Sequence, residues 1–240
     1  MNNIQANSNL NNILVGIQGG AFASASRLAV YPLEVWSTRR AVKLAMKMNH
    51  CFKGAMSSLF LNFAKQGIMI GSGKLVYDAF KNPIVTGCAV GSIESLTQPV
   101  NTLRTTMQTK CLSLKDSASS LGMKGLYRGL VAVWIRNQLW QGSQLGIYSV
   151  LRDKNDPITT SMLKGQASAL SASVLSFPMQ RVFVEQAYAR LSFAQAAKKI
   201  FTEMSCFRGI TPALARVIAT GLVLPFINSL ILDDNETTSL

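Results

Sequence analysis

The sequence predicts an all-α membrane protein whose six transmembrane helices form three two-helix repeats. Three observations support this prediction. Of the 240 residues, 48% are hydrophobic and 15% are charged, whereas about 25% of the residues in an average soluble domain carry a charge. Six apolar stretches approach the ~20 residues that a helix needs to cross a bilayer. Two short motifs also recur three times each, in alternation, along the chain.

Polar residues interrupt each apolar stretch, which favours helices that turn one face toward lipid and another toward water or other helices. Small residues four positions apart, such as Gly87 and Gly91, let two helix backbones approach closely. The stretches cover residues 12–37, 56–80, 83–108, 130–151, 160–184 and 210–232. The repeats that contain them are predicted to span 1–81, 82–156 and 157–240.

The first recurring motif lies toward the end of the first, third and fifth apolar stretches. It is a proline with a polar residue two positions later. Because a proline removes a helical hydrogen bond and kinks a helix, we expect a kink at each copy. The prolines are Pro32, Pro99 and Pro178, and the polar residues that follow them are Glu34, Asn101 and Gln180.

The second motif is an aromatic residue, a lysine or arginine, and a glycine. An arginine follows the last two copies seven residues after the glycine, at Arg136 and Arg216. Backbone N–H groups at a helix start favour phosphate, so each copy is a candidate anion contact. The copies are Phe52-Lys53-Gly54, Tyr127-Arg128-Gly129 and Phe207-Arg208-Gly209.

Basic residues gather in alternate loops. The chain carries 24 Lys and Arg against 11 Asp and Glu, a formal net charge of +13. The stretches 37–53, 104–128 and 181–208 each hold five of these cations. Under the positive-inside rule these three loops face the interior, and both termini face outward.

The interleaved motifs resemble those of the mitochondrial carrier family, in which P-x-[DE]-x-x-[KR] ends each odd helix and an aromatic-[KR]-G begins each even helix. The resemblance runs from about Gly16 to Phe226, although family members usually have near 300 residues. The first helix, from Gly19 to Glu34, is similar to that of ADP/ATP carriers, with a double glycine, small residues and Arg27 five residues before Pro32.

The resemblance implies helices around a central cavity, a monomer in the mitochondrial inner membrane, and termini toward the intermembrane space. It also implies cardiolipin head groups at the second motif, on Gly54, Arg128, Gly129, Arg208 and Gly209. An Asn-rich start, short loops and eroded motifs raise the further hypothesis that an intracellular pathogen encodes the protein and delivers it to host mitochondria.

The family pattern implies two gates, both with few charges in this chain. On one side Glu34 and Arg104 are expected to form an ion pair, while Asn101 and Gln180 stand where the family has acidic residues. On the other side the family ends each even helix with [YF]-[DE]-x-x-[KR]. Residues 77–81, which Lys81 completes, are the only full copy, and Asp78 is expected to pair with Arg152. We therefore expect weak gates and exchange that is leaky or unidirectional.

Positively charged side chains inside predicted membrane segments are candidates for binding the substrate, because burying such a charge in a membrane costs free energy and is rare without a function. The family positions place Arg136, Asn137 and Arg216 in the cavity. The first repeat can be aligned with the other two in two ways. One places Leu61 and Asn62 at the cavity, and the other places Lys65 and Gln66 there; we prefer Lys65. With Arg27, four positive charges would then face an adenine nucleotide such as ATP or ADP. The pair Arg136-Asn137 favours the alternative of a di-, tricarboxylate or keto-acid carrier.

Other classes of protein fit less well. A non-transporting membrane scaffold is a further alternative, since the gate motifs are degenerate. A nucleic-acid binder of this charge would usually be less apolar. The single histidine, His50, and four scattered cysteines give no nucleophile–base set or metal cluster, so we expect neither an enzyme nor a cofactor.

Overall fold

The structure, a computed structural model, describes residues 28–46, 51–52, 54–56, 58–60, 63, 76, 79–151, 153 and 157–221. Within these ranges the chain is helical, and short turns without any strand join the helices. The helices are α2 (Tyr31–Ala41), α4 (Pro83–Glu94), the 3₁₀ helix η2 (Ser95–Thr97), α5 (Gln98–Lys110), α6 (Leu114–Leu126), α7 (Leu130–Leu151), α8 (Ile158–Ala189), α9 (Phe193–Thr202) and the helical segment 210–221.

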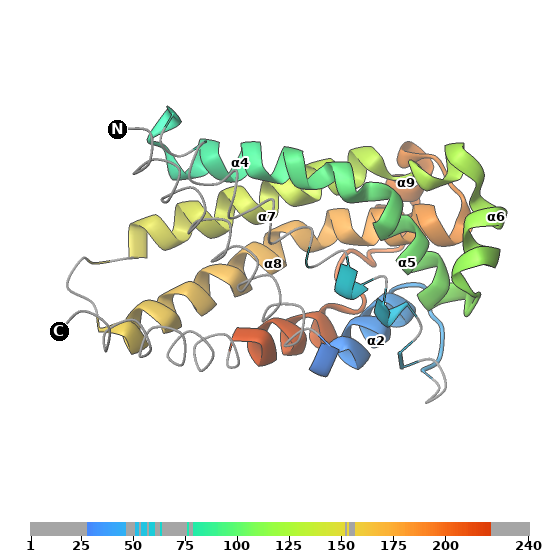
Figure 1. Cartoon of the computed structure of the whole chain (residues 1–240), viewed down its shortest axis with the longest axis horizontal. Coiled ribbons are helices and arrows are strands. Elements are labelled where there is room, and N and C mark those ends of the chain that lie inside the picture. Colours follow the sequence, from blue (N-terminus) through green and yellow to red (C-terminus); the bar gives the residue numbers. More distant parts are fainter. Residues whose placement is uncertain are drawn as a thin grey trace, which may run out of the picture.

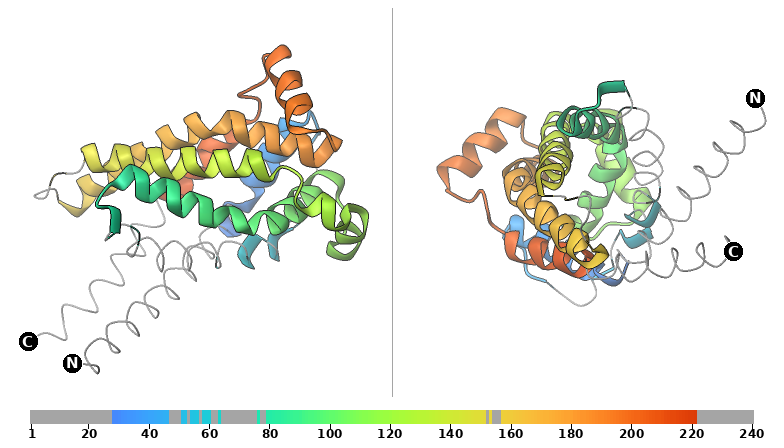
Figure 2. Two further views of the ribbon diagram at one scale, coloured as in Figure 1. Left: turned by 90° about the horizontal axis from the view of Figure 1, so that it is seen from above. Right: turned by 90° about the vertical axis from the view of Figure 1, so that its left-hand side faces the viewer.

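The long helices α7 and α8 lie side by side in opposite directions, and α4 packs along α7 (Figure 1). Helices α2, α5, α6 and α9 gather toward one end of the molecule, at the right in Figure 1. The view along the long axis in Figure 2 shows the helices arranged as a ring. The described helices, from α2 to the segment 210–221, therefore surround a common axis.

Local sequence signals explain where several helices start and end. The Asn82 side chain accepts hydrogen bonds from the backbone N–H groups of Ile84 and Val85, and Pro83 occupies the first turn of α4. Ser192 and Gln195 form a capping box at the start of α9. Helix α8 ends at Ala189, and the next residue, Arg190, has a left-handed φ of 58° that stops the helix.

The three repeated prolines occupy two kinds of position. Pro32 and Pro99 lie in the first turns of α2 and α5, where a missing N–H costs no helical hydrogen bond. At Pro99 the chain leaves the direction of α4 through η2 (Figure 1). Pro178 lies inside α8. The helix is thus interrupted just before Pro99, as expected, whereas α8 continues through Pro178 as one α-helix.

Two glycines allow α4 to pack directly on the backbone of α7. A Cβ atom at Gly87 would lie 2.4 Å from the carbonyl oxygen of Gln141, and one at Gly91 would lie 2.7 Å from that of Asn137. Real Cβ atoms do not approach other atoms so closely. The close approach that the small residues predict is therefore present between these helices.

The apolar core lies where α7, α8, α9 and the end of α2 meet. Its residues are buried and come from distant parts of the sequence: Ala41, Val42, Ala132, Val133, Val182, Phe183, Val184, Ala187, Ala196 and Ile200. Arg181 is buried beside it, and its Nε donates to the Ser205 carbonyl at 3.2 Å. This core fixes the end of α8 that follows Pro178.

The predicted fold of six transmembrane helices is wrong for the part of the chain that the structure describes. No helix there combines the length and the apolar character needed to cross a membrane. Helix α7 has 22 residues, but Arg136, Asn137, Gln138 and Gln141 interrupt its middle. Polar side chains that face neighbouring helices lower the hydropathy of the stretches that the sequence analysis interpreted as spans. Most of 12–37 and 56–80 lies outside the described residues.

Candidate functional site

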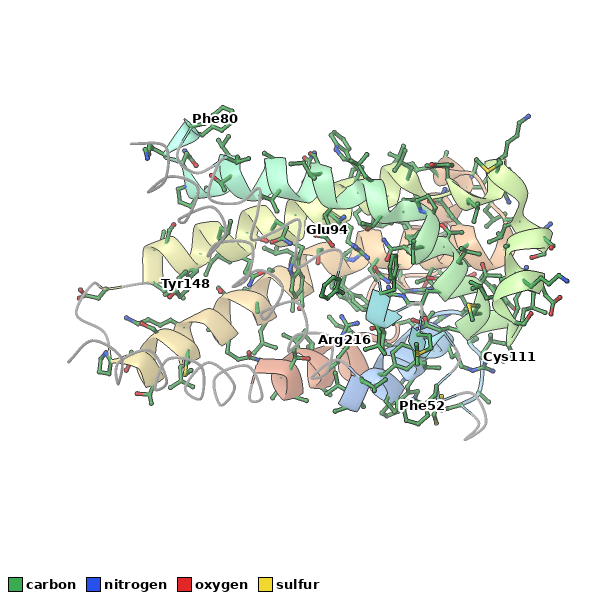
Figure 3. The ribbon with its side chains drawn as sticks, in the orientation of Figure 1. Phe52, Phe80, Glu94, Cys111, Tyr148 and Arg216 are labelled. Carbon is green, nitrogen blue, oxygen red and sulfur yellow. The ribbon has the colours of Figure 1, made fainter. Side chains whose placement is uncertain are left out.

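A polar cavity of about 300 Å³ lies between the helices, midway along the molecule. Among the described residues, three arginines and two glutamates line it, which leaves one net positive charge. These charged residues are Arg104, Arg136, Arg216, Glu34 and Glu94. Figure 3 shows Glu94 and Arg216 in the middle of the molecule, with Tyr148 toward one end and Cys111 toward the other. The volume lies at the lower end of the range of small-molecule pockets, roughly 300–1,000 Å³.

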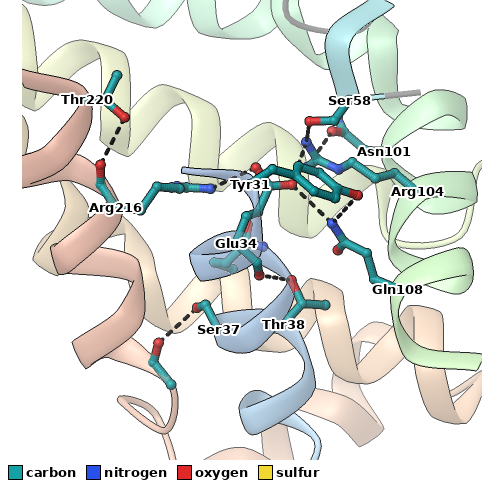
Figure 4. A network of polar contacts seen from close by, with 12 residues as sticks. Tyr31, Glu34, Ser37, Thr38, Ser58, Asn101, Arg104, Gln108, Arg216 and Thr220 are labelled. Carbon is teal, nitrogen blue, oxygen red and sulfur yellow. Dashed lines mark hydrogen bonds and ion pairs between the residues drawn. The ribbon is translucent and has the colours of Figure 1, made fainter. Parts of the chain in front are cut away.

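Glu34 joins two of the arginines. Its Oε1 lies 3.0 Å from Nη1 of Arg104, and its Oε2 lies 3.2 Å from Nη1 of Arg216. Figure 4 shows the carboxylate between the two guanidinium groups. The pair of Glu34 with Arg104 is the ion pair that the sequence predicts, whereas Arg216 was expected to face the substrate.

Neutral side chains complete the Glu34 network. Nε2 of Gln108 donates to Glu34 Oε1 at 3.2 Å and to Tyr31 Oη at 3.0 Å. Nη2 of Arg104 donates to Asn101 Oδ1 at 3.4 Å. Burial, with the Glu34 charge as a second cause, raises the pKa of Tyr31, so its hydroxyl stays neutral. The network therefore contains one carboxylate shared by two cations.

Arg136 has a different environment. Its Nη1 donates to Oε1 of Gln180 at 2.6 Å, and its Nε donates to Oδ1 of Asn137 at 2.9 Å, an oxygen that Nη2 also contacts. Within the described chain these hydrogen-bond partners are amides. Burial lowers the pKa of Arg136 to about 10, while the nearby Glu94 charge raises it. The guanidinium is therefore charged at neutral pH.

The second cavity carboxylate, Glu94, lies beside the same part of α7. Its Oε2 accepts a hydrogen bond from Gln141 Nε2 at 3.0 Å, and the residue is 6% exposed. Asn137 Nδ2 donates to Ser95 Oγ at 3.2 Å. These contacts join α4 and η2 to α7 at the level of the cavity.

Farther along the bundle the lining changes from charged to aromatic and amide. Trp140 and Gln144 follow Arg136 at spacings of four residues, which places all three on one face of α7. From α8, Gln166 lines the cavity, and its Nε2 donates to the Val217 carbonyl at 2.9 Å. The cavity thus has an arginine-rich part and a part lined by an indole ring and amides.

Several predicted site residues lie outside the described part of the chain or away from the cavity. Arg27, Lys65, Asp78 and Arg152 lie outside the described residues. Lys81 is exposed at the start of α4. Gln180, predicted to lie at a gate, lines the cavity and accepts a hydrogen bond from Arg136.

The residues predicted to bind lipid have contacts within the chain. Arg128 Nη1 donates to the Arg190 carbonyl at 2.9 Å, and Arg208 Nη1 lies 3.6 Å from Glu203 Oε2. The three glycines of the motif share a left-handed backbone, with φ of 80°, 88° and 88° at Gly54, Gly129 and Gly209. The aromatic residues of the motif, Phe52, Tyr127 and Phe207, are exposed.

The sequence analysis missed Glu94. A signal for it exists, because Glu94 stands five residues before Pro99, as Arg27 stands five before Pro32. Among the described residues, no group of three or more His, Cys, Asp or Glu side chains could hold a metal ion.

Comparisons with known proteins add no relative. No protein-family model matches the chain, and a search of curated proteins finds no match. The resemblance to mitochondrial carriers therefore remains a prediction from the motifs.

Proposed function

We propose that the protein binds an adenine nucleotide, or a closely similar polyanion with an aromatic group, in this cavity. The observation that carries the proposal is Arg136, a charged guanidinium in the cavity wall whose hydrogen bonds go to the amides of Asn137 and Gln180. An anion offers a guanidinium stronger, charge-assisted hydrogen bonds than an amide does. The amide groups can rotate and present their N–H₂ to the same anion.

The arrangement along α7 suits a ligand with two chemically different ends. Arg136 and Gln144 are eight residues apart, about 12 Å along the helix, and Trp140 lies between them. Phosphates would bind near the arginines, and a base would stack on the indole of Trp140, a contact worth about 1–3 kcal/mol in nucleic-acid complexes. Gln144 and Gln166 could then form hydrogen bonds with the edge of the base.

A second candidate is a small carboxylate or keto acid. The observation that favours it is that Glu34, shared by Arg104 and Arg216, and the second carboxylate Glu94 together leave the described lining with one net positive charge. A ligand of low charge and small volume matches that balance. Such a ligand would use Arg136 and would leave Trp140 without a role.

Binding by the purified full-length chain tests the proposal. We expect calorimetric titration to detect ATP and ADP, with an affinity that falls about 10- to 100-fold in Arg136→Gln, since a charge-assisted hydrogen bond contributes about 1.5–3 kcal/mol. Arg40→Gln is the matched control, because Arg40 is exposed and stacks on Trp36 at 6.0 Å from the ring centroid.

Two results would argue against nucleotide binding. Equal affinity for ATP in the wild type and in Arg136→Gln would show that Arg136 does not contribute to binding. Tight binding of malate or oxoglutarate without nucleotide binding would favour the carboxylate candidate. Uptake of labelled ATP by vesicles that contain the protein tests separately whether binding leads to transport, the activity that the sequence motifs predict.

A further inference from the structure

Glu34 places its two carboxylate oxygens in different environments. Oε1 contacts both Arg104, at 3.0 Å, and Gln108, at 3.2 Å, whereas Oε2 contacts Arg216 at 3.2 Å. Arg104 and Arg216 both line the cavity proposed to bind the anion. Glu34 and the bound anion would therefore contact the same guanidinium groups.

The two arginines are not equally accessible. The side chain of Arg216 is 23% exposed, whereas those of Arg104 and Glu34 are 9% and 4% exposed. Arg216 can thus turn toward a ligand in the cavity while Arg104 stays in place. Glu34 would still keep Arg104 and Gln108 as partners, so the departure of Arg216 would not leave a buried carboxylate alone.

We infer that Glu34 competes with the ligand for Arg216 and thereby selects ligands by charge. This inference rests on the proposed function. Glu34 is a monoanion whose charge is shared by two cations. A terminal phosphate carries about −1.5 to −2 charges at pH 7 and can contact an arginine through two oxygens. A phosphate therefore displaces Glu34 from Arg216, and a single carboxylate does not.

Displacement has a structural effect, because Arg216 belongs to the segment 210–221 and Glu34 belongs to α2. The ion pair joins the two regions, and beside it Ser37 Oγ donates to the carbonyl of Gly209, the residue before the segment, at 2.8 Å. Both are visible in Figure 4. Loss of the first would loosen segment 210–221 from α2 when the ligand binds.

A double-mutant cycle on the full-length protein tests the competition, with calorimetric titration of ATP as the readout. We expect Glu34→Gln to bind ATP about ten-fold or more tightly, because the competitor is removed. In an Arg216→Gln background, Glu34→Gln should change the affinity less than about two-fold. Simple removal of a negative charge is controlled by Glu94→Gln, since Glu94 also lines the cavity and should give a smaller gain.

Three results would overturn the inference: unchanged or weaker ATP binding in Glu34→Gln, the same gain in both backgrounds, or an equal gain in Glu94→Gln. If Glu34→Gln does not fold, Glu34→Asp keeps the charge but withdraws it from Arg216, and an intermediate gain is then expected. A wild-type protein that binds no ATP refutes the proposed function itself, whereas ATP binding that depends on Arg136 but ignores Glu34 refutes the competition alone.

Discussion

Arg136 and Arg216 come from equivalent positions of a repeated motif, yet they have different partners. Arg216 has a carboxylate at 3.2 Å, and Arg136 has the amides of Gln180 and Asn137. The difference follows from the first repeat, which supplies Glu34, while the second and third supply Asn101 and Gln180 at the equivalent positions. A change of one residue type within a repeated motif thus decides which arginine is available to an anion.

The pH dependence of binding should follow the protonation of the ligand's terminal phosphate and not that of Arg136. Arg136 is charged below its pKa of about 10, so it keeps its charge through the neutral range. A terminal phosphate has a second pKa near 6 and loses charge as the pH falls through that value. We expect ATP affinity to be constant between about pH 7.5 and 8.5 and to weaken below about pH 6.5, as measured by titration in buffers of equal ionic strength. A loss of affinity between pH 7.5 and 8.5 would point to a different titrating group.

Some contacts between single residues could be predicted from the sequence, and others could not. The ion pair of Glu34 with Arg104 could be predicted because the family that the motifs resemble pairs these positions of neighbouring repeats. The contact of Arg216 with Glu34 joins residues 182 positions apart and depends on the rotation of two helices. Sequence spacing does not fix that rotation.

At the scale of helices, α4 and α7 depend on glycine for their close contact. Gly87 lies so near α7 that an added Cβ would be 2.4 Å from the backbone oxygen of Gln141. Backbone atoms cannot move aside as the end of a flexible side chain can. The two helices would have to separate, and the cavity residues Asn137 and Gln141 would move with α7.

We therefore expect Gly87→Ala to destabilise the protein by about 1–3 kcal/mol, the usual effect of overpacking, despite the higher helix propensity of alanine. Gly165→Ala is the matched control on α8, because its Cβ would lie 3.9 Å from the nearest atom, in Tyr148. This change should instead stabilise by about 0.5–1 kcal/mol. Denaturant unfolding followed by circular dichroism compares the two, and equal effects would contradict the packing argument.

The two longest helices were predictable from the apolar stretches, whereas α6 and α9 lie in the stretches 104–128 and 181–208 that the sequence analysis interpreted as loops. The stretch 130–151 coincides with α7, and 160–184 lies within α8. Their interpretation as membrane spans failed, because α7 carries Arg136, Asn137 and Gln141 to the cavity wall and α8 carries Gln166 and Gln180 there. Apolar length predicted where helices form, but it did not distinguish a lipid-facing helix from one that packs around a polar interior.

For the molecule as a whole, the net charge of +13 should attract anions over distances longer than any contact in the cavity. Raising the ionic strength from about 10 mM to about 150 mM shortens the screening length from about 30 Å to about 8 Å. We expect ATP association to slow substantially over this range, with a smaller change in dissociation, as measured by stopped-flow mixing. Because the field comes from the whole chain, Arg40→Gln should show nearly the same salt dependence. An association rate independent of salt would exclude this steering.

Helix α8 is the longest described element and has a mechanical consequence. Its 32 residues form a rod of about 48 Å. Pro178 leaves the Val174 carbonyl without its helical donor, which gives the rod a pivot beside Gln180. The arm after the pivot is held by the buried Arg181 and Phe183, and the arm before it packs along α7 and donates from Gln166 to the Val217 carbonyl, so a tilt about the pivot would shift its contacts with α7 and segment 210–221. Tilting that arm by about 10° would carry its far end, about 30 Å away, through about 5 Å. A small adjustment around a bound anion would thus be amplified into a large displacement at the opposite end of the molecule.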